Sequence, residues 1–279
     1  MERLKYVVTF IFANLHLSVV QTKPFTPIIG ESCQLKIGDM EIYLENTVSK
    51  PPSINVYGIS PLFKIYGNIA LFAETGANSI NAKKRGKLIV EFNDKDIYSI
   101  HIPLIYVNGI LFGNRTFNYN SPLIVDSLNT GLSAYIKFNP DKKGFFGSLF
   151  GGSQKTFPDY VTGYIVETSF ITIDTKNFDH KCKAKEKDYK ETIEGEWTNY
   201  LQFGKTKYWS KEEYKIPTLS KQYDNNGKEK YIIPSDSCFR KDILAFKIDD
   251  KDESQKWKEE YEQIQRNDRE LRKKFIKKK

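Results

Sequence analysis

Cysteine and histidine are scarce in this chain, and each occurs only three times among 279 residues. Cys33, Cys182 and Cys238 are odd in number and show no Cys-x-x-Cys spacing. The sequence therefore indicates neither a disulfide framework nor a zinc site. Such sparing use of cysteine is typical of a reducing compartment. We predict a cytoplasmic protein without a bound metal.

Motifs of catalysis are also missing. His16, His101 and His180 fall in three different settings, which are a helical segment, a strand-like segment and a charged loop. The chain has no Gly-x-Ser-x-Gly nucleophile elbow and no His-Glu-x-x-His metal motif. We predict a protein that is not an enzyme and that requires no cofactor.

No linker rich in proline, glycine or serine divides the chain. The length is enough to bury a substantial core. We predict one domain over residues 1–279, with a helix and a barrel over about 3–174 and a C-terminal subdomain over about 175–279.

The first twenty residues contain the apolar run that most resembles a leader. Arg3 and Lys5 precede this run, as basic residues do in a secretory signal. Asn14 and His16 interrupt it, no small-x-small cleavage pattern follows, and the segment is too short and polar for a membrane span. Two interpretations remain, a buried core helix or a secretory signal, and the interruptions favour the core helix.

Residues from about 34 to 174 have the composition of successive strands. Segments rich in β-branched and aromatic residues often alternate with polar ones, and Asn/Gly/Asp breaks separate them. The clearest segments are Glu41–Leu44, Ser53–Tyr57, Lys64–Tyr66, Lys87–Phe92, Ile97–Ile102 and Ser133–Phe138. This pattern predicts a mostly β protein (α+β), in which a large antiparallel sheet curls into an incomplete barrel.

The segment from about 253 to 275 has the period of a helix. Apolar side chains recur at spacings of 4, 3, 7 and 4 along one face, while charges fill the others. These residues are Trp257, Tyr261, Ile264, Leu271 and Phe275. We predict a long C-terminal helix whose apolar stripe packs in the core.

The formal net charge of +8 favours anionic partners such as acidic membrane surfaces. Five of the last seven residues, 273–279, are lysine, so a solvated tail is the alternative explanation. The glycine- and phenylalanine-rich segment from Gly144 to Gly152 is either a turn folded onto the core or a loop that touches a membrane.

Two segments far apart in the chain carry a family resemblance. The first reads Lys-Pro-Phe-Thr-Pro-Ile-Ile-Gly-Glu from Lys23 to Glu31, and the second contains Lys258, Glu262 and Arg266. They resemble the oxysterol-binding protein family, which has a Lys-Pro-Phe-Asn-Pro-x-x-Gly-Glu motif and a C-terminal helix with Lys, Glu and Arg four residues apart. Shorter matches, Gly195–Trp197 and Asp236–Ile243, follow in the family's order.

The family's Glu-Gln-Val-Ser-His-His-Pro-Pro signature corresponds here to Glu-Asn-Thr-Val-Ser-Lys-Pro-Pro, from Glu45 to Pro52. Ser49 and Lys50 therefore stand where the family has its two histidines. The resemblance implies a lipid tunnel with an aromatic and apolar lining, and a buried helix before the Lys-Pro-Phe motif. It also predicts a domain without the family's N-terminal lid, since the sequence begins at the segment that follows it.

The resemblance also implies a headgroup site for phosphatidylinositol 4-phosphate. Steps of four residues advance only about 40° around a helix, so Lys258, Glu262 and Arg266 share one stripe. Two cations beside a carboxylate suit a phosphate, although such pairs also occur on many exposed helices. We predict a headgroup site made of Lys23, Thr26, Ser49, Lys50, Lys258, Glu262 and Arg266.

Two functions follow from this resemblance. The first is non-catalytic binding and transfer of a sterol, a phosphatidylinositol phosphate or both, at acidic membrane surfaces that the protein contacts transiently, without a nucleic-acid partner. The second is a structural subunit of a larger protein assembly that keeps the fold and has lost lipid exchange. The substituted histidines and the missing lid favour the second, and the motif series favours the first.

Overall fold

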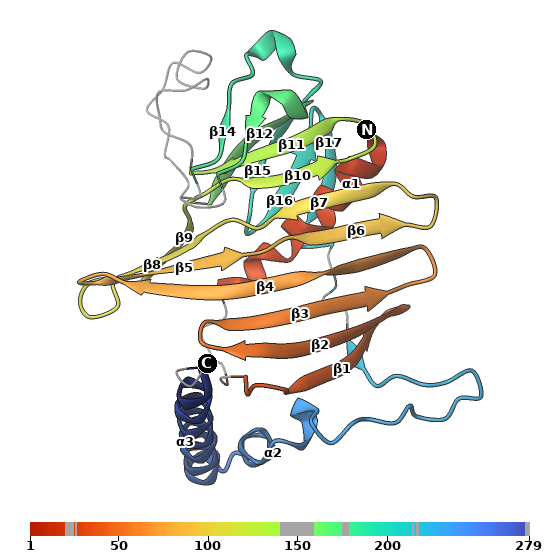
Figure 1. Ribbon diagram of the computed structural model, residues 1–279. Helices are drawn as coiled ribbons and strands as arrows, with labels where there is room; N and C mark the ends of the chain where they lie inside the picture. The colour runs from red at the N-terminus through yellow and green to blue at the C-terminus, as the bar shows by residue number, and fades with distance from the viewer. Residues whose placement is uncertain are drawn as a thin grey trace. The chain divides into compact units, whose positions relative to one another are not determined.

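Antiparallel strands make up most of the fold, with helices near the two ends of the sequence (Figure 1). The structure, a computed structural model, describes residues 1–19, 25, 27–139, 159–174, 179–213, 215 and 218–276. Lys23, Thr26 and the segment Gly144–Gly152 lie outside these residues. The chain forms two units, one of residues 1–20 with 71–216 and the other of residues 21–70 with 217–279.

The first unit contains a long antiparallel sheet with strand order β17-β16-β15-β12-β11-β10-β7-β6. A second run of antiparallel pairs joins β5, β8 and β9, and β13 pairs with β14. These strands are β5 (Ser79–Arg85), β6 (Leu88–Phe92), β7 (Ile97–His101), β8 (Ile105–Asn108), β9 (Thr116–Tyr119), β10 (Leu123–Ser127), β11 (Leu132–Phe138), β12 (Tyr160–Glu167), β13 (Ile171–Thr172), β14 (Lys181–Cys182), β15 (Glu191–Glu196), β16 (Tyr200–Phe203) and β17 (Thr206–Ser210). Among the described strands β17 pairs only with β16, so the sheet is not closed.

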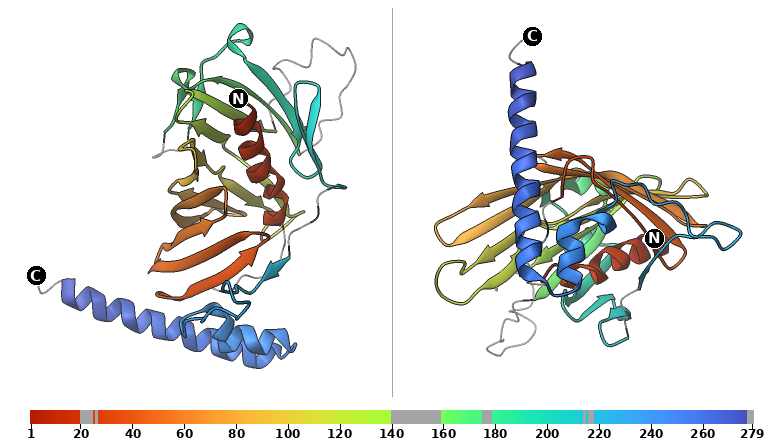
Figure 2. Two further views of the ribbon diagram at one scale, coloured as in Figure 1. Left: turned by 90° about the vertical axis from the view of Figure 1, so that its right-hand side faces the viewer. Right: turned by 90° about the horizontal axis from the view of Figure 1, so that it is seen from below.

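Helix α1 (Glu2–Ala13) covers one face of this sheet (Figure 2). Leu4, Val8 and Phe12 recur every four residues and are at most 1% exposed. The Phe12 ring meets Trp209 of β17 edge-on, with 5.9 Å between ring centroids. The N-terminal segment therefore packs as the core-helix interpretation predicts.

Gly195 in β15 illustrates why the short Gly-x-Trp match matters to the fold. A Cβ atom at Gly195 would lie 2.3 Å from the carbonyl oxygen of Tyr200 in β16, which is a steric clash. Glycine has no Cβ atom and therefore fits at this position. Trp197 follows and is 2% exposed, and its ring contacts Tyr119 at a centroid distance of 5.2 Å. The glycine allows β16 to approach, and the tryptophan then fills the core.

The strands of the second unit pair in the order β4-β3-β2-β1-β18. Two helices follow them, α2 (Lys241–Lys247) and α3 (Lys251–Ile276). The strands are β1 (Ser32–Ile37), β2 (Met40–Ser49), β3 (Pro52–Ile59), β4 (Phe63–Thr75) and β18 (Leu219–Ser220). The predicted fold class, a mostly antiparallel β protein with an N-terminal helix and a long C-terminal helix, is confirmed.

The prediction that the whole apolar stripe of the C-terminal helix is core was wrong. Ile264, Leu271 and Phe275 are 52%, 56% and 75% exposed. Helix α2 has only seven residues and lies beside the first turns of α3 (Figure 2), so it covers Trp257 and Tyr261 but not the later turns. A helical period identifies a common face, but it does not show what covers that face.

His180 lies buried in the first unit with its imidazole in the neutral form. Its Nδ1 atom accepts a hydrogen bond from the backbone N–H of Asp174 at 3.0 Å. Burial lowers the pKa of His180 and the nearby His101 lowers it further, although Asp174, Asp179 and Asp126 oppose this shift. Protonation of His180 therefore favours the unfolded chain.

We expect the free energy of unfolding to fall as pH drops below about 6.5, the ordinary histidine value, towards the lower pKa of folded His180. In this window the unfolded state binds the proton and the folded state does not. Urea denaturation between pH 7.5 and 5 should show a shallower pH dependence for His180→Gln than for the wild type. Identical slopes for the two proteins would contradict this assignment.

Candidate functional site

The described residues of the predicted headgroup site lie in the second unit. Lys258, Glu262 and Arg266 are on α3, Ser49 ends β2, and Lys50 lies in the turn between β2 and β3. Lys23 and Thr26 fall outside the described residues. The chain thus contributes one helix and one hairpin to the region.

The charged stripe on α3 has the arrangement expected from its spacing. Glu262 Oε1 lies 4.0 Å from Lys258 Nζ, and Glu262 Oε2 lies 3.3 Å from Arg266 Nη2. The Lys258 side chain is only 11% exposed, whereas that of Arg266 is 59% exposed. One carboxylate therefore lies between two cations, the first nearly buried and the second open to solvent.

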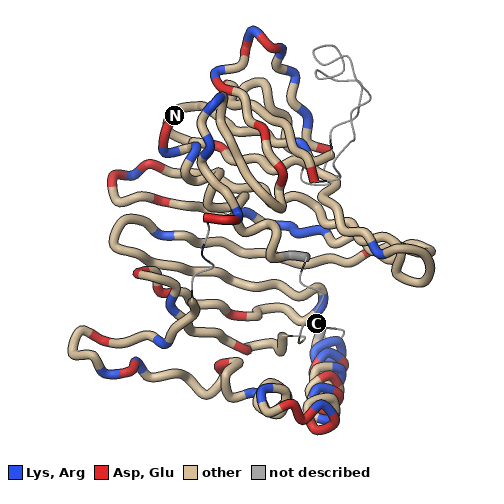
Figure 3. Tube along the Cα trace, turned by 180° about the vertical axis from the view of Figure 1, so that it is seen from behind, with Lys and Arg blue, Asp and Glu red and all other residues tan. Residues whose placement is uncertain are grey.

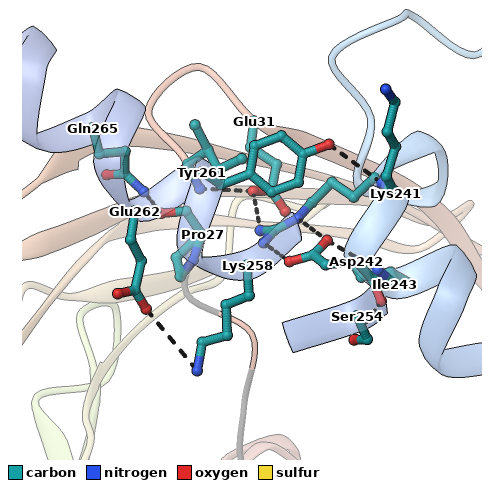
Figure 4. Close-up of polar contacts among 12 residues, drawn as sticks. Pro27, Glu31, Lys241, Asp242, Ile243, Ser254, Lys258, Tyr261, Glu262 and Gln265 are labelled. Atoms are coloured by element: carbon teal, nitrogen blue, oxygen red, sulfur yellow. Dashed lines mark hydrogen bonds and ion pairs between the residues drawn. The ribbon is translucent and has the colours of Figure 1, made fainter. Parts of the chain in front are cut away.

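The carbonyl oxygen of Pro27 joins three of the sequence motifs. It accepts a hydrogen bond from Asn46 Nδ2 of β2 at 3.2 Å. It accepts another from Gln265 Nε2 of α3 at 3.2 Å (Figure 4). Asn46 is 2% exposed and Gln265 is 5% exposed. Pro27, the last residue of the Lys-Pro-Phe-Thr-Pro segment, is therefore held between β2 and α3.

Arg240 binds the residues that follow Pro27. Its Nη1 donates to Glu31 Oε2 at 2.7 Å, and the same Glu31 oxygen accepts the backbone N–H of Ile28 at 2.7 Å. Its Nε donates to Asp242 Oδ1 at 3.0 Å, and the guanidinium carbon lies 5.2 Å from the centroid of the Tyr261 ring. One buried guanidinium thus connects the loop, the start of α2 and α3.

The charges in this cluster are deeply buried. The side chains of Arg240, Asp242 and Glu31 are 6%, 0% and 12% exposed. Burial alone would lower the pKa of Arg240, but the hydrogen bonds and charges of Asp242 and Glu31 outweigh burial and raise it. Ser254 of α3 donates to the backbone carbonyl of Asp242 at 2.7 Å, which ties α3 to the cluster.

The hairpin that contains Ser49 and Lys50 has fewer contacts with α3 than the Pro27 region has. Between described residues, no hydrogen bond or ion pair joins Ser49 or Lys50 to α3. The β2–β3 register shifts between Asn46 and Val48, and Thr47 Oγ1 donates to the carbonyl of Ser53 at 3.2 Å. Lys50 is exposed, so its ammonium group is available to a ligand.

Sequence reasoning missed the residues that hold the loop. Arg240, Asp242 and Glu31 were within recognised motifs, but the contact between Arg240 and Glu31 joins positions 209 apart in the sequence. Gln265 sits beside Arg266 without any pattern of its own. The Oδ1 atom of Asn46 is buried and has no hydrogen-bond partner among the described residues, an unusual state for an acceptor in a folded core.

The first unit contains a cavity of about 1050 Å³, which is at the upper end of ordinary ligand pockets. Its lining includes Tyr135, Tyr164 and Tyr189, and the last two rings stack at a centroid distance of 4.1 Å. Lys137 and Glu194 also line it, and burial raises the pKa of Glu194. This mixed lining differs from the apolar tunnel that the resemblance implies.

The described part of the chain holds no group of three or more His, Cys, Asp or Glu side chains able to bind a metal ion. No helix in the described ranges combines the length and apolarity needed to cross a membrane.

A family model described as oxysterol-binding protein matches residues 1–279. The chain is 25% identical over 268 residues to oxysterol-binding protein 9 of Dictyostelium discoideum, a match that covers 95% of this chain and 60% of that protein. It is 27% identical over 135 residues to the human oxysterol-binding protein-related protein 8, covering 45% of this chain and 15% of that protein. The chain thus spans less than two thirds of these relatives.

Solved structures share the fold. The Osh3 ORD from Saccharomyces cerevisiae, solved in complex with PI(4)P, matches with a TM-score of 0.69 at 18% identity, covering 96% of this chain and 70% of that one. The Osh1 ORD domain, solved with ergosterol, matches with a TM-score of 0.69 at 19% identity, covering 98% and 68%. A further Osh1 structure contains cholesterol.

Proposed function

Because the chain belongs to the oxysterol-binding protein family, we propose that it binds phosphatidylinositol 4-phosphate and a sterol and transfers them between membranes without changing them chemically. The headgroup is held on α3 and on the loop and hairpin beside it. The residues that hold it are Lys23, Thr26, Ser49, Lys50, Lys258, Glu262 and Arg266.

The arrangement of Lys258, Glu262 and Arg266 is the observation that carries this proposal. Glu262 fixes both cations on the helix, so they present charge to a phosphate without a large ordering cost. Lys258 is mostly shielded from water, where a charge-assisted hydrogen bond is stronger than at the surface. Arg266 is open to solvent and can donate a forked pair of hydrogen bonds.

Ser49 and Lys50 alter the hairpin side of the site. Each charge-assisted hydrogen bond contributes about 1.5–3 kcal/mol. Lys50 brings a permanent cation of long reach, whereas Ser49 offers a neutral hydroxyl. The site therefore keeps its charge and loses the two imidazoles of the family signature.

Other observations support a lipid carrier rather than a structural subunit. The three solved structures described above are complexes with PI(4)P, ergosterol and cholesterol. Cys33, Cys182 and Cys238 are unpaired, which fits a reducing cytoplasmic setting. The membrane contact is transient and involves acidic lipid, in keeping with the net charge of +8.

Binding of short-chain phosphatidylinositol 4-phosphate to single variants, measured by calorimetry, tests the proposal. We expect Lys258→Ala to weaken binding by about 10- to 100-fold, because it removes a shielded charge-assisted hydrogen bond. Arg266→Ala should cost less than about tenfold, because solvent screens its exposed charge. Lys256→Ala is the matched control, since it removes a cation of the same helix that is 69% exposed.

Three outcomes would count against the proposal. The proposed function would be wrong if the wild-type protein bound neither this lipid nor a fluorescent sterol. Equal losses of affinity in Lys256→Ala and Lys258→Ala would show that net charge attracts the lipid without a specific site. Unchanged binding in Lys258→Ala would place the headgroup elsewhere.

A further inference from the structure

The last thirteen described residues of α3, 264–276, differ in charge and exposure from the rest of the helix. They carry five Lys or Arg residues against two Asp or Glu, whereas residues 251–263 carry three against five. Ile264, Leu271 and Phe275, which are 52%, 56% and 75% exposed, all fall in this basic part. Figure 3 shows blue residues gathering towards the C-terminal end of α3 and red ones near its start.

The apolar side chains share one face of the helix, about a quarter turn from the side chain that contacts Pro27. At 100° per residue, Leu271 and Phe275 lie within about 20° of Ile264 around the helix axis. Gln265, which binds Pro27, lies about 100° away. The Gln265–Pro27 contact therefore leaves this face uncovered.

Cations flank the apolar face on both sides. Arg272 and Lys274 each lie about 80° from Ile264, in opposite directions. Asp268 lies within the face and pairs with Arg272 at 2.8 Å, and Glu270 on the far side pairs with Lys273 at 2.8 Å. The net charge of this part of the helix remains positive.

We propose that residues 264–276 of α3 dock on an anionic lipid bilayer, with Ile264, Leu271 and Phe275 in the interface and Arg272 and Lys274 against acidic headgroups. A basic amphipathic helix of low overall hydrophobicity has the chemistry of such a surface helix. Long basic side chains beside apolar ones extend to the headgroup level while the apolar side chains enter the boundary. This docking does not depend on the headgroup site, since it needs only negative surface charge.

Sedimentation with vesicles that contain about 30% phosphatidylserine and no phosphoinositide tests the docking alone. We expect Leu271→Glu/Phe275→Glu to reduce vesicle binding at least about tenfold, because it removes apolar area and adds two negative charges. The control is Leu62→Glu/Leu128→Glu, which adds the same charge at side chains that are 69% and 59% exposed. The control should stay within about twofold of the wild type.

Several results would overturn this inference. One is wild-type protein that does not sediment with acidic vesicles at low salt. Another is equal loss in the two double variants. A third is a dimer that forms through Leu271 and Phe275 while vesicles are not bound. The apolar face of α3 would then contact a second copy of the chain and not a bilayer. Binding of short-chain phosphatidylinositol 4-phosphate in solution should stay within about twofold in Leu271→Glu/Phe275→Glu, which separates failure of docking from failure of the headgroup site.

Discussion

Arg240→Ala is expected to lower the free energy of unfolding by about 3–5 kcal/mol, the cost of removing one partner from a buried charge cluster. Without the guanidinium, the fully buried carboxylate of Asp242 and the mostly buried carboxylate of Glu31 lose the cation that pairs with both of them. Urea denaturation measures the loss. Amide hydrogen exchange in this variant should be faster in α2, in α3 and in the residues after Pro27.

Two controls separate this effect from a general loss of charge. Arg266→Ala removes the same residue type from an exposed pair with Glu262, so it should change stability by no more than about 1 kcal/mol. Arg240→Ala/Asp242→Asn should be less destabilised than the sum of its single variants, because a neutral amide in place of the carboxylate no longer leaves a buried charge. Additive losses, or a loss below about 1 kcal/mol in Arg240→Ala, would show that the cluster does not act as a unit.

Loss of Arg240 should also weaken headgroup binding, although Arg240 makes no part of the proposed contact. Glu31 holds the backbone of Ile28, and the neighbouring Pro27 carbonyl binds both β2 and α3. Release of Glu31 therefore removes one of the contacts that hold Ile28 and Pro27 beside α3. Arg240→Lys keeps the charge but not the fork of donors, and it should restore binding only in part.

Local patterns were enough to predict the first and last long helices and six of the strands. The alternation of β-branched and polar residues predicted strands where β2, β3, β4, β6, β7 and β11 lie, because one side of each pleat must be apolar. The period of 3.6 residues predicted α3 almost to its ends. The shorter strands β13, β14 and β18 have two residues each, too few for any alternation to register.

The arrangement of these elements was harder to predict. Each of the two units combines an early and a late part of the chain, and no local pattern encodes that pairing. The prediction of a single domain over 1–279 therefore remains a prediction. For the same reason, the sequence did not predict the Arg240–Glu31 pair or the Gln265–Pro27 hydrogen bond. The stripe of Lys258, Glu262 and Arg266 lies within one helix, so its spacing could be predicted.

The first turns of the chain provide the other large expected effect. Phe12→Ala should lower the free energy of unfolding by about 3–5 kcal/mol, because a fully buried ring leaves a cavity beside Trp209. Phe10→Ala is the matched control on the same helix, since Phe10 is 46% exposed and its loss should cost less than about 1 kcal/mol. A removable leader makes no such distinction between two neighbouring phenylalanines, because neither ring contributes to the folded core. Equal stability of the two variants in thermal and urea unfolding would therefore contradict the core-helix assignment, and a clear difference would establish α1 as part of the first unit.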